Sequence, residues 1–265
     1  MTHRLDSMFQ RLTQEGRTGV FPYLTVGFPS IDDTLALVPA LAEAGADLIE
    51  LGVPFSDPIA DGPTIQAASF DALQQGATLT KCLEVCKALR GNGLKVPLVL
   101  MGYYNPILSY GLDAFTRDAA QAGADGAIVP DLPPEESAPL REALKAQGLP
   151  LISLLTPTST DERISEACAL AQGFIYCVTV TGVTGARRDV STNVFELLGR
   201  IRKHTTLPIA VGFGISEREH VESLAGHAQA AVVGSALINV IHSAPPDERL
   251  RRAGDFIAKL AGWKS

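Results

Sequence analysis

Residues 41–51 read LAEAGADLIEL, which combines a helical stretch, a glycine turn and a short apolar strand. Glycine just after a helix is a common ending signal, because it adopts left-handed backbone angles without steric cost. Near-continuous apolar strands that alternate with helices are typical of a parallel sheet. The same unit recurs along the chain, and a first strand opens the series: 20–26, 89–101, 119–130, 144–155, 169–178, 202–212 and 224–234.

About eight such units fit a closed (β/α)8 barrel better than an open sheet. The first strand is not followed by the G-x-G-x-x-G motif that would favour a dinucleotide-binding open sheet. Leu5, Met8, Phe9 and Leu12 fall on one face of an N-terminal helix, which we expect to close the bottom of the barrel. We therefore predict an α/β protein, a single (β/α)8 TIM barrel domain over residues 1–265 with an extra N-terminal helix.

The composition is that of an ordinary globular enzyme, with 46% hydrophobic and 19% charged residues. A net charge of −7 argues against nucleic acid or an anionic membrane as partner. No apolar run approaches the roughly 20 residues that span a bilayer. The N-terminus lacks the apolar core of a secretory signal. We expect a cytoplasmic protein with no metal site and with reduced cysteines at Cys82, Cys86, Cys168 and Cys177.

Residues 49–66, IELGVPFSDPIADGPTIQ, place Glu50 in the second strand and Asp57 and Asp61 in the loop that follows it. Such a strand buries both faces, so an ionisable Glu50 is costly unless it has a use. A helix-capping or ion-paired Glu50 is the structural alternative. Because barrels keep their chemistry at the carboxyl ends of the strands, these carboxylates are candidate catalytic groups.

Glycines follow the seventh and eighth strands at Gly212, Gly214 and Gly234, where both segments are predicted to start helices. Backbone N–H groups and the positive dipole end of a helix bind anions there. These loops are also the usual phosphate site of a barrel. Gly185, in the Gly/Thr-rich loop after the sixth strand, adds a further N–H. We expect a small phosphorylated substrate under a loop that acts as a lid, although tight turns alone would also explain the glycines.

The other side chains at the strand ends narrow the chemistry. No lysine maps to the carboxyl end of a strand, which disfavours a Schiff-base mechanism. The histidines map to helices or bottom loops and form no metal-ligand cluster. The groups left at the mouth suit proton transfer to and from a partly aromatic substrate. Besides Glu50 and Asp61 they are Asp57, Asp131, Tyr23, Tyr103, Tyr104, Tyr176, Ile65 and Phe213.

Taken together, these motifs resemble the tryptophan synthase alpha chain family. The resemblance rests on ELGVPFSDPIADGPTIQ (50–66), TGVTGAR (181–187), GFGIS (212–216) and VVGSAL (232–237), supported by PDLPPEES (130–137) and MGYYNP (101–106). It covers essentially the whole chain in order and spacing. It implies a (β/α)8 lyase of tryptophan biosynthesis that cleaves indole-3-glycerol phosphate to indole and glyceraldehyde 3-phosphate without a cofactor of its own. It also implies a beta-chain partner that holds pyridoxal phosphate, in an alpha2-beta2 tetramer.

The resemblance further implies roles for single residues. Glu50 matches the acid and base that protonates the departing indole carbon and helps to deprotonate the glycerol hydroxyl. Asp61 matches the carboxylate that accepts a hydrogen bond from the indole N–H and stabilises the positive charge on the ring. Residues 179–181 differ from the Ser-Arg that precedes the lid motif in some members, which argues against a lid salt bridge. The expected substrate-binding residues are Tyr23 (often Phe in the family), Ile65, Tyr103, Tyr176, Thr184, Gly185, Phe213, Gly214, Gly234 and Ser235.

An apolar surface at the mouth predicts where a partner binds, because exposed apolar patches often mark interfaces. It comprises Pro54, Phe55, Pro58, Ile59, Tyr104, Pro106, Ile107 and Leu108. We expect a beta chain to dock on the loops near Asp57, Pro58 and Asn105, unless Ile107 and Leu108 pack under the following helix. Two other functions stay open on the residues alone: a phosphosugar isomerase on the same fold, and an activating subunit with a weak site.

Overall fold

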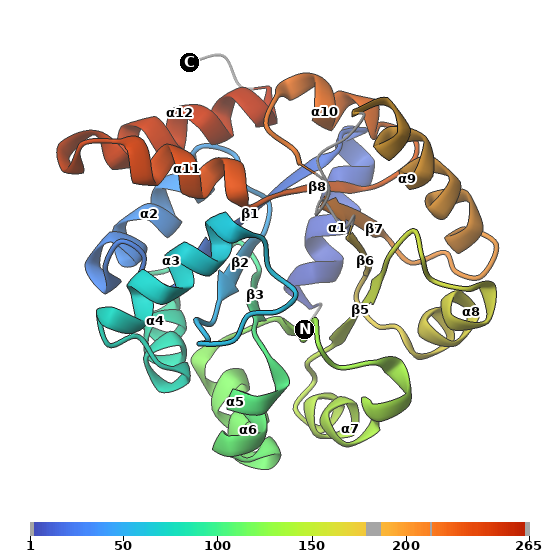
Figure 1. Ribbon diagram of the computed structural model, residues 1–265, viewed down its shortest axis with the longest axis horizontal. Helices are drawn as coiled ribbons and strands as arrows, with labels where there is room; N and C mark the ends of the chain where they lie inside the picture. Colours follow the sequence, from blue (N-terminus) through green and yellow to red (C-terminus); the bar gives the residue numbers. More distant parts are fainter. Residues whose placement is uncertain (1–2, 179–186, 213, 263–265) are drawn as a thin grey trace.

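Eight parallel strands close into a barrel in sequence order (Figure 1). The computed structural model describes residues 3–178, 187–212 and 214–262, with residues 187–192 described by their backbone only. The strands are buried along most of their length, as the apolar runs predict. They are β1 (Gly19–Thr25), β2 (Ile49–Gly52), β3 (Leu98–Met101), β4 (Gly126–Ile128), β5 (Leu151–Leu155), β6 (Ile175–Val178), β7 (Ile209–Gly212) and β8 (Ala230–Val233).

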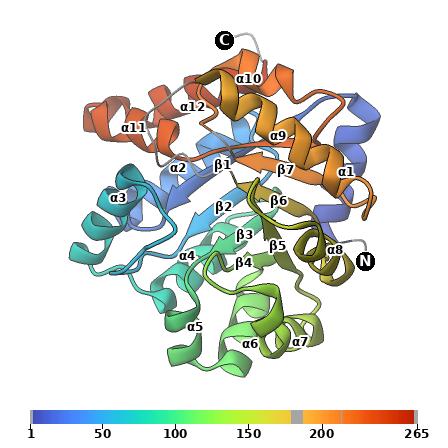
Figure 2. The same ribbon diagram turned by 45° about the vertical axis from the view of Figure 1, so that its right-hand side comes forward.

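Helices surround the barrel on the outside (Figure 2). Several begin at a side-chain cap, as at Ser30 and Thr78, whose hydroxyls accept the backbone N–H of Asp33 and Lys81. The helices are α1 (Arg4–Glu15), α2 (Ile31–Glu43), α3 (Pro63–Gln74), α4 (Leu79–Gly91), α5 (Tyr104–Tyr110), α6 (Leu112–Ala122), α7 (Ala138–Ala146), α8 (Asp161–Leu170), α9 (Arg187–Ile201), α10 (Arg218–Ser223), α11 (Ser235–Ser243) and α12 (Arg249–Ala261), with short 3₁₀ turns η1 (Pro134–Glu136) and η2 (Pro246–Glu248).

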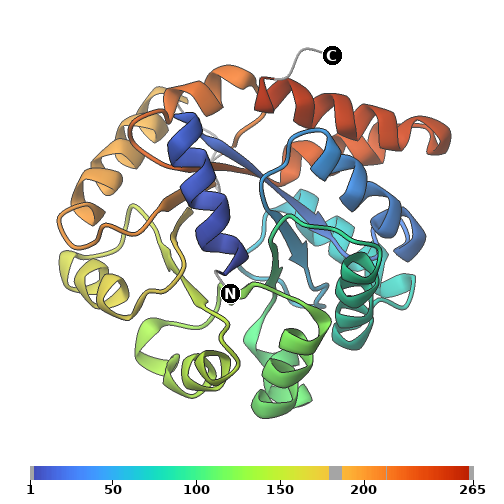
Figure 3. The same cartoon turned by 180° about the vertical axis from the view of Figure 1, so that it is seen from behind.

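The extra N-terminal helix lies across the amino-terminal end of the barrel, as predicted (Figure 3). Its buried face, Leu5, Met8, Phe9 and Leu12, joins the apolar cluster inside the barrel. The ring of Phe9 lies 5.9 Å from Phe21 and 5.7 Å from Phe174. The bottom is therefore sealed by packed aromatic side chains, which leaves the opposite end for the site.

The carboxyl ends of the strands all point to that opposite end. In the register of the sheet, Glu50 lies beside Tyr23 of β1 and Val99 of β3. A second, larger apolar layer fills the space between strands and helices and includes the buried, unpaired cysteines. Within the described ranges, no helix is both long enough and apolar enough to span a bilayer.

Candidate active site

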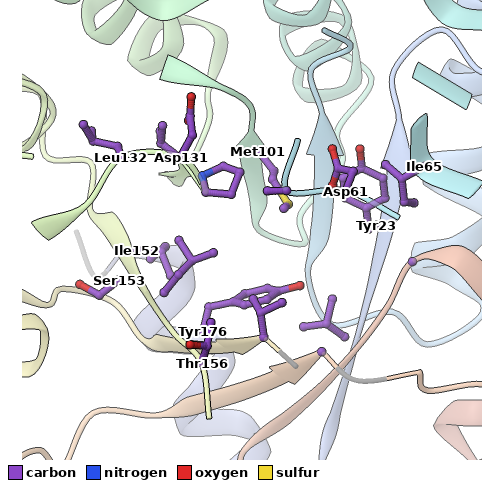
Figure 4. Close-up of a pocket in the computed structure, with 18 of the residues that line it drawn as sticks. Tyr23, Asp61, Ile65, Met101, Asp131, Leu132, Ile152, Ser153, Thr156 and Tyr176 are labelled. Carbon is purple, nitrogen blue, oxygen red and sulfur yellow. The ribbon is translucent and has the colours of Figure 1, made fainter. Parts of the chain in front are cut away.

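A cavity of about 1140 Å³ opens at the carboxyl ends of the strands (Figure 4). It brings together side chains from distant parts of the chain, as a barrel mouth should. Glu50 and Tyr103 are buried and do not belong to its lining, although Glu50 pairs in the sheet with the lining residue Tyr23 and Tyr103 contacts the lining residue Asp61. The predicted site residues that line it are Tyr23, Asp61, Ile65, Tyr176, Gly214, Gly234 and Ser235.

Glu50 is the buried carboxyl of the site, with 0% of its surface exposed. Neither of its carboxylate oxygens accepts a hydrogen bond within the described part of the chain. Burial raises the pKa of Glu50 to about 8, and the nearby Tyr176 hydroxyl opposes that rise only in part. Glu50 is therefore mostly protonated at neutral pH and has a proton that it can donate. This geometry argues against a capping or ion-paired Glu50.

Asp61 is held by a tyrosine. The Tyr103 hydroxyl donates to Oδ2 of Asp61 at 2.9 Å and accepts the backbone N–H of Ala60 at 3.0 Å. The Tyr103 ring lies 5.3 Å from Phe55, which fixes its orientation. Burial raises the pKa of Asp61, while the Tyr103 hydrogen bond lowers it. Asp61 thus faces the cavity with one oxygen oriented by the protein.

The segment that carries Asp61 is also anchored on α3. The Ser69 hydroxyl accepts the N–H of Phe55 at 2.9 Å and donates to the carbonyl of Phe55 at 3.0 Å. The Gln66 side chain donates to the carbonyl of Asp61 at 2.9 Å. Although it has no regular secondary structure, this loop is held at both ends, which preorganises Asp61.

The hydroxyl groups of two tyrosines, Tyr23 and Tyr176, lie close to the glycines that end β2 and β7. A Cβ atom at Gly52 would lie 2.1 Å from the Tyr23 hydroxyl, and one at Gly212 would lie 2.9 Å from the Tyr176 hydroxyl. Both positions must therefore stay free of a side chain for the rings to lie as they do. Burial raises the pKa of both phenols, so they stay protonated. Sequence reasoning missed this requirement, although a strand that ends in Gly is a readable signal.

Gly214, Gly234 and Ser235, which the sequence assigns to a phosphate site, all line the cavity, but only the segment at Gly234 starts a helix. Gly234 is the N-cap of α11 and Ser235 its first residue, so free backbone N–H groups face this region. Gly214 has a left-handed φ of 55°, and the next helix begins only at Arg218. The prediction that both segments start helices is wrong for Gly214, because Glu217 caps α10 further along the chain.

Thr184, Gly185 and Phe213 lie outside the described residues, as do the side chains of Arg187 and Arg188. Asp131 lines the cavity and accepts the backbone N–H of Tyr104 at 2.9 Å. Across the described ranges, no group of three His, Cys, Asp or Glu side chains could hold a metal ion.

The apolar surface expected at the mouth is smaller than predicted. Ile59 and Leu108 are exposed, at 84% and 54%. Pro54 and Ile107 are buried instead. The alternative that Ile107 and Leu108 pack inside the protein is therefore correct for Ile107 and wrong for Leu108. On α5, one helical turn cannot present neighbouring residues to the same side, which explains this split. Asp57, two positions before Ile59, and Asn105, three positions before Leu108, are also exposed.

Comparison with known proteins agrees with this geometry. The family described as tryptophan synthase alpha chain matches residues 9–259. The tryptophan synthase alpha chain of Roseiflexus sp. (strain RS-1) is 54% identical over 98% of this chain and 99% of its own length. The tryptophan synthase of Saccharomyces cerevisiae is 43% identical over 97% of this chain and 36% of its own length.

Solved structures give the same result. A tryptophan synthase alpha chain from Legionella pneumophila superposes with a TM-score of 0.90 at 32% identity, over 99% of this chain and 97% of that one. A Mycobacterium tuberculosis tryptophan synthase chain superposes with a TM-score of 0.89 at 37% identity, over 99% of this chain and 98% of that one. The chain therefore belongs to the tryptophan synthase alpha chain family, and it is a carbon–carbon lyase that cleaves indole-3-glycerol phosphate to indole and glyceraldehyde 3-phosphate.

Proposed function

We propose that Glu50 is the proton-transfer group of this cleavage. Its protonated carboxyl donates to the indole carbon that carries the glycerol chain, which places a positive charge on the ring. The carbon–carbon bond then breaks, its electron pair returns to the ring, and the Glu50 carboxylate helps to remove the hydroxyl proton as the aldehyde forms. The observation that carries this role is a fully buried carboxyl whose oxygens have no partner in the described part of the chain. A pKa near 8 suits an acid that must also act as a base near neutral pH.

Asp61 takes the complementary role at the indole nitrogen. As a carboxylate it accepts the ring N–H and stabilises the positive charge that protonation creates. Its hydrogen bond from Tyr103 supports this role, because a fixed carboxylate needs no reorganisation during the reaction. Tyr23, Ile65 and Tyr176 supply the apolar and aromatic wall against which the indole ring lies.

The substrate phosphate binds at the ends of β7 and β8, next to Tyr23 and Ile65. Free N–H groups at the start of α11 and the open backbone at Gly214 support a site formed by Gly214, Gly234 and Ser235. Gly185 would add an N–H, Thr184 would close the lid over Asp61, and Phe213 would border the ring.

A beta chain is the partner, in an alpha2-beta2 tetramer, and it alone holds pyridoxal phosphate. The exposed side chains of Ile59 and Leu108 support docking on the loops near Asp57, Pro58 and Asn105. We further propose that residues 1–265 act as one domain in the cytoplasm.

The decisive experiment is an indole-release assay with indole-3-glycerol phosphate, run with and without a beta chain. Release by the chain alone, increased by the beta chain, is the expected result. No release under either condition, with the activity of the beta chain still increased by this chain, would favour an activating subunit. Tighter binding of a bare triose phosphate than of the non-cleavable indolepropanol phosphate would favour an isomerase.

A further inference from the structure

The cavity continues beyond the substrate region, outward over β5 into a slot between α7 and α8. Its lining includes Leu151 and Ser153 of β5 and Leu170 of α8. Ile152 packs inside the barrel, so its neighbours Leu151 and Ser153 point to the helices. Both helices pack on β5 and on η1 rather than closely on each other, which leaves this slot open. Elsewhere the same layer is filled with apolar side chains.

The slot lies away from the proposed chemistry. Figure 4 shows Ser153 and Leu132 on the side of the cavity opposite Asp61 and Ile65. The proposed phosphate site includes Gly234, the N-cap of α11, and Figure 1 shows α11 across the barrel from α7 and α8. A substrate held between those groups leaves the slot free.

The slot is lined by Arg141, whose guanidinium group is only partly hydrogen-bonded. The Arg141 side chain on α7 is only 16% exposed, and its Nη1 group donates to the Ser137 hydroxyl at 2.7 Å. Within the described ranges the one carboxylate within 4 Å is Glu142, at 3.8 Å from Nε. Nε and Nη2 donate no hydrogen bond there, whereas the buried Arg90 bonds Asp125 and three backbone carbonyls.

The Arg141 nitrogens without a partner are not among the fully buried side-chain atoms of the described residues, so solvent in the cavity reaches them and an anion that enters it can bind them. The Ser137 hydroxyl accepts from Arg141 and donates its own proton to the carbonyl of Pro134 at 2.8 Å, so it offers the guanidinium a neutral oxygen and no negative charge. Arg163 at the rim has its nearest described carboxylate, Glu135, at 3.8 Å. The hydroxyls of Thr156 and Thr158 add polar groups on the mouth side of the slot.

We propose that this slot binds a small amphiphilic oxyanion. Its carboxylate or phosphate group lies on the Arg141 guanidinium, whose planar donors match both anions. Its compact apolar body lies between Leu151 and Leu170, over Ser153. The slot and the substrate site are occupied at the same time.

The test is a calorimetric titration of benzoate into the chain saturated with indolepropanol phosphate. Saturable binding is expected. Arg141→Gln should weaken it by about tenfold or more, because it removes a charge-assisted hydrogen bond. The control Arg117→Gln changes an exposed arginine paired with Asp118 and should leave the affinity within about twofold of wild type. Acetate, which lacks the apolar body, should bind far more weakly than benzoate.

Three results would overturn the proposal: no benzoate binding, equal affinity in wild type and Arg141→Gln, or competition with indolepropanol phosphate. If acetate bound as tightly as benzoate, the proposed contact of an apolar body with Leu151 and Leu170 would be wrong. Phenyl phosphate serves as a second probe, and its affinity relative to benzoate assigns the head group. Should Arg141→Gln fold poorly, Leu170→Trp, which fills the slot, must abolish benzoate binding. Binding of indolepropanol phosphate alone is measured separately, so a failure of the proposed lyase site is recognised independently.

Discussion

Buried carboxylates are hydrogen-bonded at the bottom of the barrel, whereas the one at its mouth has no partner among the described residues. At the bottom, Asp47 is 1% exposed and is fully partnered. Its oxygens accept two hydrogen bonds from Arg17 at 2.7 Å, one from Arg11 at 2.7 Å and one from the Val20 N–H at 3.1 Å. At the mouth, Glu50 is equally buried and its oxygens accept none within the described residues.

The bottom arrangement occurs twice. Asp125 is also 1% exposed and accepts Arg4 at 2.9 Å, the Leu98 N–H at 2.8 Å and Arg90. Each aspartate ends an AGAD sequence, at 44–47 and 122–125. Arg4 and Arg11 lie seven residues apart, which is two helical turns, so α1 presents both to the barrel from one face.

This difference supports the proposal that Glu50 is a functional group and that Asp47 and Asp125 are structural. A buried carboxylate that only stabilises the fold is given cations and N–H groups, because an unpaired one costs free energy. Glu50 is left without them, so its proton stays and its pKa rises. In the proposed mechanism, the unpartnered Glu50 lowers the stability of the fold and keeps a proton that it can transfer.

Replacing the unpartnered carboxyl is expected to have the largest effect. Glu50→Gln keeps the shape and removes proton transfer, so turnover should fall by about 10²–10⁴-fold while indolepropanol phosphate still binds. Its free energy of unfolding should not fall, since no hydrogen bond to Glu50 is lost among the described residues. Indole release and thermal unfolding measure the two quantities. Turnover within about threefold of wild type would remove Glu50 from the mechanism.

The reverse pattern is expected at the bottom. Asp125→Ala leaves the largely buried Arg90 side chain, which is 10% exposed, without its carboxylate, and breaking such a pair typically costs about 3–5 kcal/mol of folding free energy. Chemical denaturation gives this value. The folded fraction should cleave substrate with an unchanged KM, because the mouth is untouched. A matched surface variant, Asp118→Ala, should change stability little. A loss of turnover without a loss of stability would contradict the division between the two ends.

Sequence periodicity was sufficient to predict the barrel, α1 and the placement of Glu50 and Asp61. Alternation of helices and apolar strands is a local signal, and barrel topology then fixes which strand ends meet. The pairing of Asp47 and Asp125 with arginines was not predicted, because it joins residues far apart in the chain. The same holds for the slot between α7 and α8, which depends on how two helices pack. Ile107 and Leu108 show a further limit, since an apolar pair does not say which side chain points outward.

The pH dependence of stability should distinguish the two ends further. The folded state holds the Glu50 proton up to a pKa of about 8, against 4.5 for an ordinary Glu, so it binds more protons than the unfolded state between these values. The stability from this group is complete below pH 4.5 and is lost as the pH rises to about 8. Glu50→Gln should lack this loss. If wild type and Glu50→Gln showed parallel stability curves over this range, the pKa of Glu50 would not be raised.

The smallest effect concerns Asp61, whose partner at the mouth is a neutral phenol rather than an arginine. Tyr103→Phe removes the hydroxyl that orients Asp61 and accepts the Ala60 N–H, so kcat/KM should fall by about tenfold, the value of one hydrogen bond to a charged group. Because the lost hydrogen bond had lowered the pKa of Asp61, the acidic limb of the kcat/KM profile should also move to higher pH. The matched control is Tyr110→Phe, which removes a similar hydrogen bond to Asp118 at the surface and should leave the profile unchanged. A fall in kcat/KM without a shift of the acidic limb would mean that Tyr103 contacts the substrate rather than holding Asp61. In that case the contrast between the ends would rest on Glu50 alone.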